Sequence, residues 1–293
     1  MASSEGAPSL LSTRSAVGIE GRRGAFERVF PTDVQAVATS ALISPRSVVQ
    51  RTVAIYSRRL DWFISQAFQP SEAATAADVR SRFLDQLRSA WPEEQRLRLL
   101  DAGCGAGRDL AAFHALGHEV EGLDPCEQLA AAARERAVGA RVHCTDFWGV
   151  TRGELGDYGA PPSCRGHFHG IFCFASLHHL QRKDLKSVLR ALCGLLLEGG
   201  VLLTTLDAAA SEYEDRDCLG VDGRWRNCMP AAGFLGALQV AGFQVQHVSS
   251  IFMYSTRATL AISRRPRVDV AQKLAHEAAS RRHGANASSA SSR

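Results

Sequence analysis

The chain has 293 residues, of which 45% are hydrophobic and 22% charged, which predicts one sizeable folded domain with additional tails. Its apolar runs are too short and too interrupted to span a bilayer, and no signal-peptide pattern opens the chain. We therefore expect neither a membrane protein nor a secreted one. Eight cysteines without a Cys-x-x-Cys pair or zinc-finger spacing predict reduced thiols and no metal site, with Cys104, Cys144 and Cys173 buried.

Charge is concentrated near the C-terminus. Residues 263–293 hold seven Lys and Arg against two acids, a net charge of +5, whereas the whole chain carries +4 and residues 1–262 therefore −1. A folded part that is not basic disfavours a nucleic-acid partner. The composition predicts disorder for an N-terminal extension, residues 1–48, and for a basic tail, residues 266–293. The extension also fits a mitochondrial or plastid transit peptide, but its four acids favour a cytoplasmic protein.

The first regular elements are a helix and a strand. Residues 75–90 place Val79, Phe83, Leu84 and Leu87 on one helical face, and Pro92 separates this helix from a strand at residues 96–100. The strand leads into a turn with glycine at every second position, followed by an alanine-rich helix. This order predicts a strand-turn-helix unit, in which Asp109 would cap the helix rather than contact a ligand.

The glycine turn predicts a cofactor site. Gly103, Gly105 and Gly107 alternate where a Cβ would prevent close approach of a ligand to the backbone, which suits a nucleoside-type cofactor. A dinucleotide fingerprint would have glycine at the sixth position, where this chain has Arg108, and this argues against NAD. A tight turn without a ligand is the alternative.

Two acids follow the next two expected strands. Asp124 ends a strand at residues 118–124 and is placed to bind ribose hydroxyls, or else to cap a helix at 127–136. Asp146 and Phe147 follow a strand at 140–144. A carboxylate beside an aromatic ring suits adenine, because the acid can accept from the exocyclic amine while the ring packs on the base.

The remaining pattern continues the alternation of strands and helices. Strands are expected at residues 167–175 and 201–206, then a polar loop at 207–229, a helix at 231–241, and two strands at 243–250 and 251–263. His178 and His179 directly follow the first of these strands.

In this order the motifs resemble class I S-adenosylmethionine-dependent methyltransferases, over about residues 56–262. The matching segments are the glycine turn, Gly122-Leu123-Asp124, Thr145-Asp146-Phe147, residues 168–180 and residues 195–201. Within the class, Ala-Ser-Leu-His-His at 175–179 looks like a branch of small bacterial-type enzymes that act on small molecules. Departures are His169, where the family commonly has an acid, and Glu198, where it often has proline.

The resemblance implies an α/β fold: one Rossmann-like domain, residues 49–265, with seven strands, mostly parallel, a terminal antiparallel hairpin, and helices on both faces. It also implies that S-adenosylmethionine is the cofactor. By resemblance, Asp101 and the Gly103, Gly105 and Gly107 backbone hold its amino-acid end, Asp124 its ribose, and Asp146 with Phe147 its adenine.

Acceptor residues are expected near the carboxyl ends of the strands. His178 or His179 could act as a base or bind the acceptor, and the alternative is a helix start without chemistry. Four residues of the polar loop suit an anion on the acceptor, or a merely solvated surface: Arg216, Arg224, Trp225 and Arg226. Tyr56 could close over the site, or simply pack its helix on the domain.

The sequence thus predicts a methyltransferase acting on nitrogen, sulfur or oxygen of a small polar acceptor, with an anionic acceptor as one option. Two alternatives stay open. One is an RNA or protein methyltransferase that uses the basic tails, and the other is a non-catalytic partner subunit with the same fold. The oligomeric state is left open.

Overall fold

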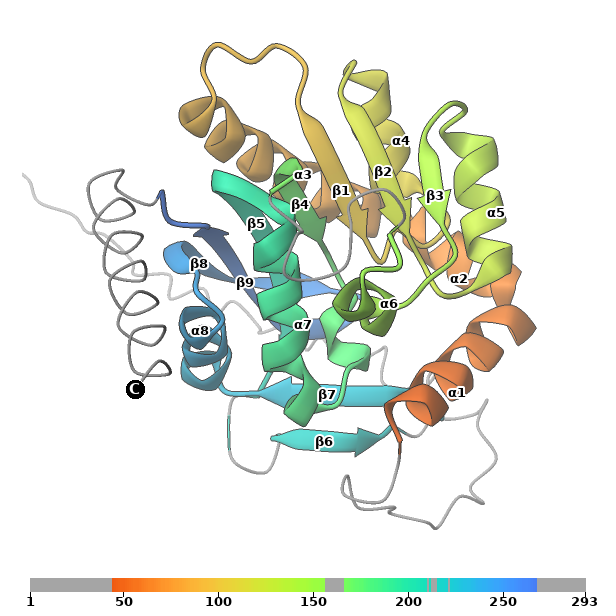
Figure 1. Ribbon diagram of the computed structural model, residues 1–293. Helices are drawn as coiled ribbons and strands as arrows, with labels where there is room; N and C mark the ends of the chain where they lie inside the picture. The colour runs from red at the N-terminus through yellow and green to blue at the C-terminus, as the bar shows by residue number, and fades with distance from the viewer. Residues whose placement is uncertain (1–43, 156–165, 210, 212–214, 221, 268–293) are drawn as a thin grey trace, which may run out of the picture. The chain divides into compact units, whose positions relative to one another are not determined.

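The computed structural model describes residues 44–155, 166–209, 211, 215–220 and 222–267. Three helices precede the first strand, strands and helices alternate from β1 to β5, and the described part of the chain ends in two hairpins separated by α8 (Figure 1). The helices are α1 (Pro45–Arg58), α2 (Leu60–Ala67), α3 (Pro70–Ala90), α4 (Arg108–Ala115), α5 (Glu127–Arg136), α6 (Phe147–Arg152), α7 (Arg182–Leu195) and α8 (Ala231–Val240). The strands are β1 (Arg98–Ala102), β2 (Glu119–Leu123), β3 (Arg141–His143), β4 (Phe168–Cys173), β5 (Leu196–Ala208), β6 (Arg216–Leu219), β7 (Trp225–Met229), β8 (Gln244–Met253) and β9 (Thr256–Arg264).

The sheet has a parallel half and an antiparallel end. Strands β3, β2, β1, β4 and β5 lie side by side in parallel, and β9 pairs with β5 antiparallel and continues into the hairpin with β8. The expected α/β fold with a terminal antiparallel hairpin is thereby confirmed. Parallel strands place their carboxyl ends at one edge, which is where ligands of such sheets bind.

Each face of the sheet is covered by helices. Leu99 and Leu100 are neighbours in β1, but Leu99 packs in a buried cluster with α3, α4 and α5, and Leu100 in a second cluster with α6, α7 and α8. Successive side chains of a strand point to opposite faces, so an uninterrupted apolar strand fits a sheet buried on both sides.

The predicted polar loop at residues 207–229 is wrong. Strand β5 continues to Ala208, and β6 and β7 form an antiparallel hairpin, with β7 also parallel to the end of β5. The sheet therefore has nine strands among the described residues rather than seven. The turn signal was present, because Asp222-Gly223 is a common hairpin dipeptide and Gly223 has a φ of 79°.

The predicted domain boundaries also shift slightly. Helix α1 begins at Pro45, with the Ser44 side chain accepting from Ser47, and Val48 is buried. Residues 45–48, predicted as part of the extension, are thus helical. At the other end, Arg267 donates to the carbonyl of Ala90 and lies over the Trp91 ring. The rest of the predicted extension and tail, residues 1–43 and 268–293, lies outside the described residues.

Of the three cysteines predicted to be buried, two are buried in the structure. Cys104 and Cys173 are buried, but Cys144 is exposed, because β3 is short and ends before it. Over the described ranges the cysteines are thiols, and no group of three or more metal-ligating side chains is found. In the same part of the chain, no helix is both long and apolar enough to cross a membrane.

Candidate active site

The glycine turn lies between β1 and α4, and its three glycines do different things. All three have positive φ, from 52° to 87°. A Cβ on Gly103 would lie 2.5 Å from the Ser176 Cβ, and one on Gly107 would lie 2.8 Å from the Ala133 backbone, so these two allow internal packing. A Cβ on Gly105 would meet no described atom within 4 Å. Only Gly105 therefore faces open space, where a ligand could approach the backbone.

Asp124 ties this turn to the end of β2. Its carboxylate accepts from the backbone N–H of Gly105 (3.0 Å) and of Cys126 (2.9 Å), one on each oxygen. Burial raises the pKa of Asp124 to about 6, although both hydrogen bonds lower it. Helix α5 begins after Cys126 and has no side-chain cap, so Asp124 is not its N-cap. The carboxylate is fixed beside the open turn, with lone pairs left for hydroxyl groups.

Asp101 and Asp109 form the other side of the turn. Asp101 is buried at the end of β1, and its Oδ2 has no hydrogen-bond partner in the described part of the chain. Burial, with the nearby charge of Asp109, raises the pKa of Asp101 well above its usual value. Asp109 pairs with Arg80 and Arg108 instead of capping α4, so the capping prediction is wrong. An unpartnered buried carboxylate oxygen fits a cationic or donor group of a ligand.

Asp146 and Phe147, the two residues predicted to bind adenine, are partly buried and buried, respectively. Asp146 is the N-cap of α6 and accepts from the Gly149 N–H at 2.8 Å, which leaves its second oxygen for other donors. The Phe147 side chain packs in the core beneath α7. An adenine contact by Asp146 stays a prediction, and Phe147 has mainly a packing role.

The chain turns sharply after β4. Ala175 has a φ of 56°, an uncommon conformation for a residue with a Cβ, and its N–H donates to the buried Thr205 hydroxyl at 2.8 Å. Such strain costs on the order of 1–3 kcal/mol and persists where surrounding contacts fix it. The turn leads into the short 3₁₀ helix Leu177–His179, which carries both histidines.

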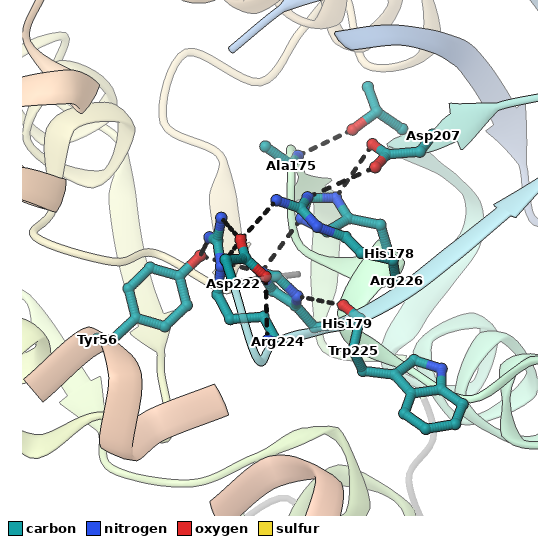
Figure 2. A network of polar contacts seen from close by, with 10 residues as sticks. Tyr56, Ala175, His178, His179, Asp207, Asp222, Arg224, Trp225 and Arg226 are labelled. Carbon is teal, nitrogen blue, oxygen red and sulfur yellow. Dashed lines mark hydrogen bonds and ion pairs between the residues drawn. The ribbon is translucent and has the colours of Figure 1, made fainter. Parts of the chain in front are cut away.

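A closed set of polar contacts lies at this edge of the sheet (Figure 2). From His179, contacts run to the Tyr56 hydroxyl (2.9 Å), from there to Arg224 (2.9 Å), and through Asp222 to Arg226. Arg226 lies 3.6 Å from Asp207, which lies 3.4 Å from His178, and the two histidines are 3.2 Å apart. We call this the polar ring: Tyr56, His178, His179, Asp207, Asp222, Arg224 and Arg226.

The hydrogen position on His179 follows from its partners. His179 Nδ1 lies 3.0 Å from the carbonyl of Trp225, which can only accept, so Nδ1 carries the hydrogen and Nε2 accepts from the Tyr56 hydroxyl. His178 has two polar neighbours, His179 Nε2 at 3.2 Å from its Nε2 and Asp207 at 3.4 Å from its Nδ1. Its Nδ1 is buried and without a hydrogen-bond partner among the described residues. Burial, and then nearby charges, lower the pKa of both histidines well below the usual value, so both are neutral.

The charges of the polar ring balance. Arg224 contacts Asp222 through Nε (2.8 Å) and Nη2 (2.6 Å), and Arg226 lies between Asp222 and Asp207. Burial raises the pKa of Asp207 to about 6, against the lowering effect of both arginines. The sequence predicted that Arg224 or Arg226 binds an anion of the acceptor. In the structure the chain itself supplies these anions, so the arginines do not require an anionic acceptor.

Two other predicted acceptor residues lie elsewhere. The Trp225 side chain is completely buried and its indole donates to Asp217 at 2.8 Å, so it stabilises the hairpin and is not available to a ligand. Arg216 is exposed at the start of β6, opposite Cys228, and is not a member of the polar ring. Alternation along β7 explains why Trp225 is buried while its neighbour Arg226 reaches the polar ring.

Tyr56 lies where the cofactor turn and the polar ring meet. Helices α1 and α2 pack on Ala106 of the glycine turn and on α5, with Tyr56 in this cluster. Burial raises the pKa of Tyr56, and the charge of Asp124 adds to this while Arg224 opposes it. These contacts place Tyr56 next to the glycine turn and Arg224, and its role toward an acceptor stays a prediction.

Sequence reasoning missed two members of the polar ring, Asp207 and Asp222. Asp207 could have been noticed, because it ends the fifth strand at the edge where ligands bind. Asp222 gave no such signal, since its role depends on the folded hairpin.

The chain matches methyltransferases in sequence and in fold. A family model described as "Methyltransferase domain" matches residues 71–248, and the chain belongs to this family. Among solved structures, the chain resembles 1,6-didemethyltoxoflavin-N1-methyltransferase from Burkholderia thailandensis, with a TM-score of 0.58 and 20% identity over 80% of this chain and 98% of that one. It also resembles magnesium protoporphyrin IX methyltransferase from Synechocystis PCC 6803, with a TM-score of 0.56 and 16% identity over 78% and 100%.

Curated relatives differ in the molecules they are named for. The mRNA cap guanine-N(7) methyltransferase of Aspergillus oryzae is 32% identical over 116 residues, 36% of this chain and 22% of that protein. This chain thus matches a small part of that relative's length. The ubiquinone biosynthesis O-methyltransferase of Xanthomonas axonopodis pv. citri is 27% identical over 191 residues, 62% of this chain and 77% of that protein.

Proposed function

We propose that the protein transfers a methyl group from S-adenosylmethionine to a small, polar, uncharged acceptor that loses a proton from oxygen, nitrogen or sulfur. The observation that carries the acceptor proposal is the unpartnered, buried Nδ1 of His178, 3.4 Å from the Asp207 carboxylate. The proposal has two parts, a cofactor half and an acceptor half, and the cofactor half rests on the residues around the glycine turn.

The cofactor half fits S-adenosylmethionine. The two similar solved structures are described with bound S-adenosylhomocysteine and with S-adenosylmethionine. In this chain Gly105 leaves the backbone open, Asp124 has lone pairs for ribose hydroxyls, and Asp101 has an unpartnered oxygen for the amino-acid end. When bound, this cofactor supplies a methyl group activated on a sulfonium.

The acceptor half fits removal of a proton. A methyl acceptor such as a hydroxyl must lose its proton, and a base helps only when it is unprotonated beforehand, which for histidine is the neutral form. His178 is neutral, so one of its ring nitrogens is a lone pair, and a proton on Nδ1 would lie beside Asp207. His179 uses both ring nitrogens for Tyr56 and Trp225, so its role is to hold His178 and Tyr56.

A macromolecular acceptor is the second candidate, because relatives named as mRNA cap methyltransferases are 32% and 34% identical over 116 and 100 residues. The net charge of +5 in residues 263–293 adds to this reading. Against it stands the balanced charge of the polar ring, since phosphate-bearing acceptors favour unpaired arginines.

A screen with radiolabelled S-adenosylmethionine tests the proposal. The full-length protein is incubated with small phenols, alcohols, thiols and amines, and in parallel with capped RNA and with protein. We expect label transfer to an uncharged small molecule, and none to RNA at physiological salt. Transfer only to capped RNA would replace the small-molecule acceptor with the second candidate. Binding of the cofactor without transfer to any acceptor would favour a non-catalytic partner subunit.

The pH dependence gives a second test. At saturating cofactor, the turnover number should fall below about pH 6, because the raised pKa of Asp207 means that its carboxylate is neutralised there. Saturation is needed because the pKa of Asp124 is also about 6. No step near pH 6.5 is expected from His178, whose pKa lies well below that value. In Asp207→Asn the acidic fall should disappear; an unchanged profile would remove Asp207 from the reaction.

A further inference from the structure

The tip of the β6–β7 hairpin places a carboxylate where an acceptor's own carboxylate would bind. Asp222 Oδ2 lies 2.8 Å and 2.6 Å from Nε and Nη2 of Arg224 and 3.2 Å from Nη2 of Arg226. Its Oδ1 accepts from the Arg224 N–H at 3.0 Å. Both guanidinium N–H groups of Arg224 donate to Oδ2, and these are the groups with which arginine binds a carboxylate ligand.

This carboxylate is held in place by its own turn. The hairpin closes through the Gly220 N–H to the Arg224 carbonyl (2.7 Å) and the Gly223 N–H to the Gly220 carbonyl (2.8 Å). A Cβ at Gly223 would lie 2.9 Å from the end of the Ile55 side chain, so the tip also packs on α1. The turn therefore fixes the backbone of Asp222, and the contacts to Arg224 and Arg226 hold its side chain.

Arg224 is equally fixed. Its guanidinium lies over the Phe63 ring (4.8 Å) and the Tyr56 ring (5.3 Å), and its Nη1 donates to the Tyr56 hydroxyl. It cannot follow an incoming anion out of the polar ring. An acceptor carboxylate would therefore have to displace Asp222, or lie beside it against like-charge repulsion.

We propose that Asp222 is a specificity-determining residue: as an internal carboxylate it occupies Arg224 and Arg226 and excludes carboxylate-bearing molecules from the acceptor site. This rests on the proposed function only in taking the polar ring as the acceptor site. Asp222 is a repulsive element: its negative charge would oppose a carboxylate ligand but not an uncharged ligand of the same shape.

The test compares benzoate with benzamide, which has nearly the same shape without the charge, by calorimetric titration of the full-length protein. The native chain should bind benzoate no better than benzamide. Asp222→Asn should bind benzoate about 10- to 150-fold more tightly than the native chain does, as expected for charge-assisted hydrogen bonds to a freed arginine. Its affinity for benzamide should change little.

Two further variants keep the result specific. Asp215→Asn removes one negative charge from the same segment, where Asp215 pairs with Arg182 and not with the polar ring, and it should behave like the native chain. Asp222→Asn combined with Arg224→Gln should lose the gain in benzoate affinity. Preference of the native chain for benzoate, or no gain in Asp222→Asn, would overturn the proposal. The titration needs no methyl acceptor, so it stands or fails independently of the methyl-transfer screen.

Discussion

Replacing Asp124 with alanine should weaken binding of S-adenosylmethionine by about 10- to 150-fold, the equivalent of about 1.5–3 kcal/mol for hydrogen bonds to an ionised group. The carboxylate is fixed by the Gly105 and Cys126 N–H groups, each of its oxygens keeps a further lone pair, and Gly105 beside it faces open space. Calorimetric titration measures the dissociation constant directly and needs no acceptor.

Controls separate this effect from loss of structure. Asp85→Ala removes an exposed carboxylate that pairs with Arg88 on α3, and should leave cofactor affinity unchanged. Asp124→Asn keeps one acceptor oxygen and should lie between alanine and the native chain. An unchanged dissociation constant in a folded Asp124→Ala protein would rule out the ribose assignment.

Replacing His178 with alanine should lower the turnover number by about 100- to 10,000-fold, the usual contribution of a general base. The physical reason is that His178 alone of the two histidines has a ring nitrogen without a hydrogen-bond partner among the described residues. Steady-state kinetics on the acceptor returned by the screen gives the measurement. The loss should be largest for acceptors that are fully protonated at neutral pH.

Two other histidines, one in contact with His178 and one on α4, provide the comparison. His179→Ala removes the contacts to Tyr56 and Trp225, so we expect a raised Michaelis constant and a smaller loss of turnover than in His178→Ala. His114→Ala, on the exposed side of α4, should have native kinetics. If His179→Ala lost more turnover than His178→Ala, the base would be assigned to the wrong ring.

The charge balance of the polar ring changes the kind of acceptor to look for. The arginine pair suggested an anionic acceptor from sequence, yet Asp207 and Asp222 neutralise both side chains. Uncharged protic molecules should therefore take precedence in the screen, with carboxylates tested on Asp222→Asn.

The amino-acid sequence by itself determined the α/β fold, the first five strands in chain order and S-adenosylmethionine as the cofactor. Helix 127–136 was predicted with the bounds that the structure has, and Asp124 lies at the end of its strand as expected. These features are local, because the apolar runs, the glycines with positive φ and the acids that follow strands lie within a few residues of one another. Their sequence pattern therefore predicts them without knowledge of the tertiary contacts.

Only the tertiary structure decided the acceptor side. The polar ring joins α1, the segment after β4, the end of β5 and the β6–β7 hairpin, and its contact between Tyr56 and Arg224 joins residues 168 positions apart. The sequence could not show that Trp225 would be buried or that Asp222 would occupy the arginines, because both follow from how a two-stranded hairpin packs on α1 and β5. Which charges meet depends on the folded chain, since an ion pair needs two groups within a few ångströms whatever their separation in sequence.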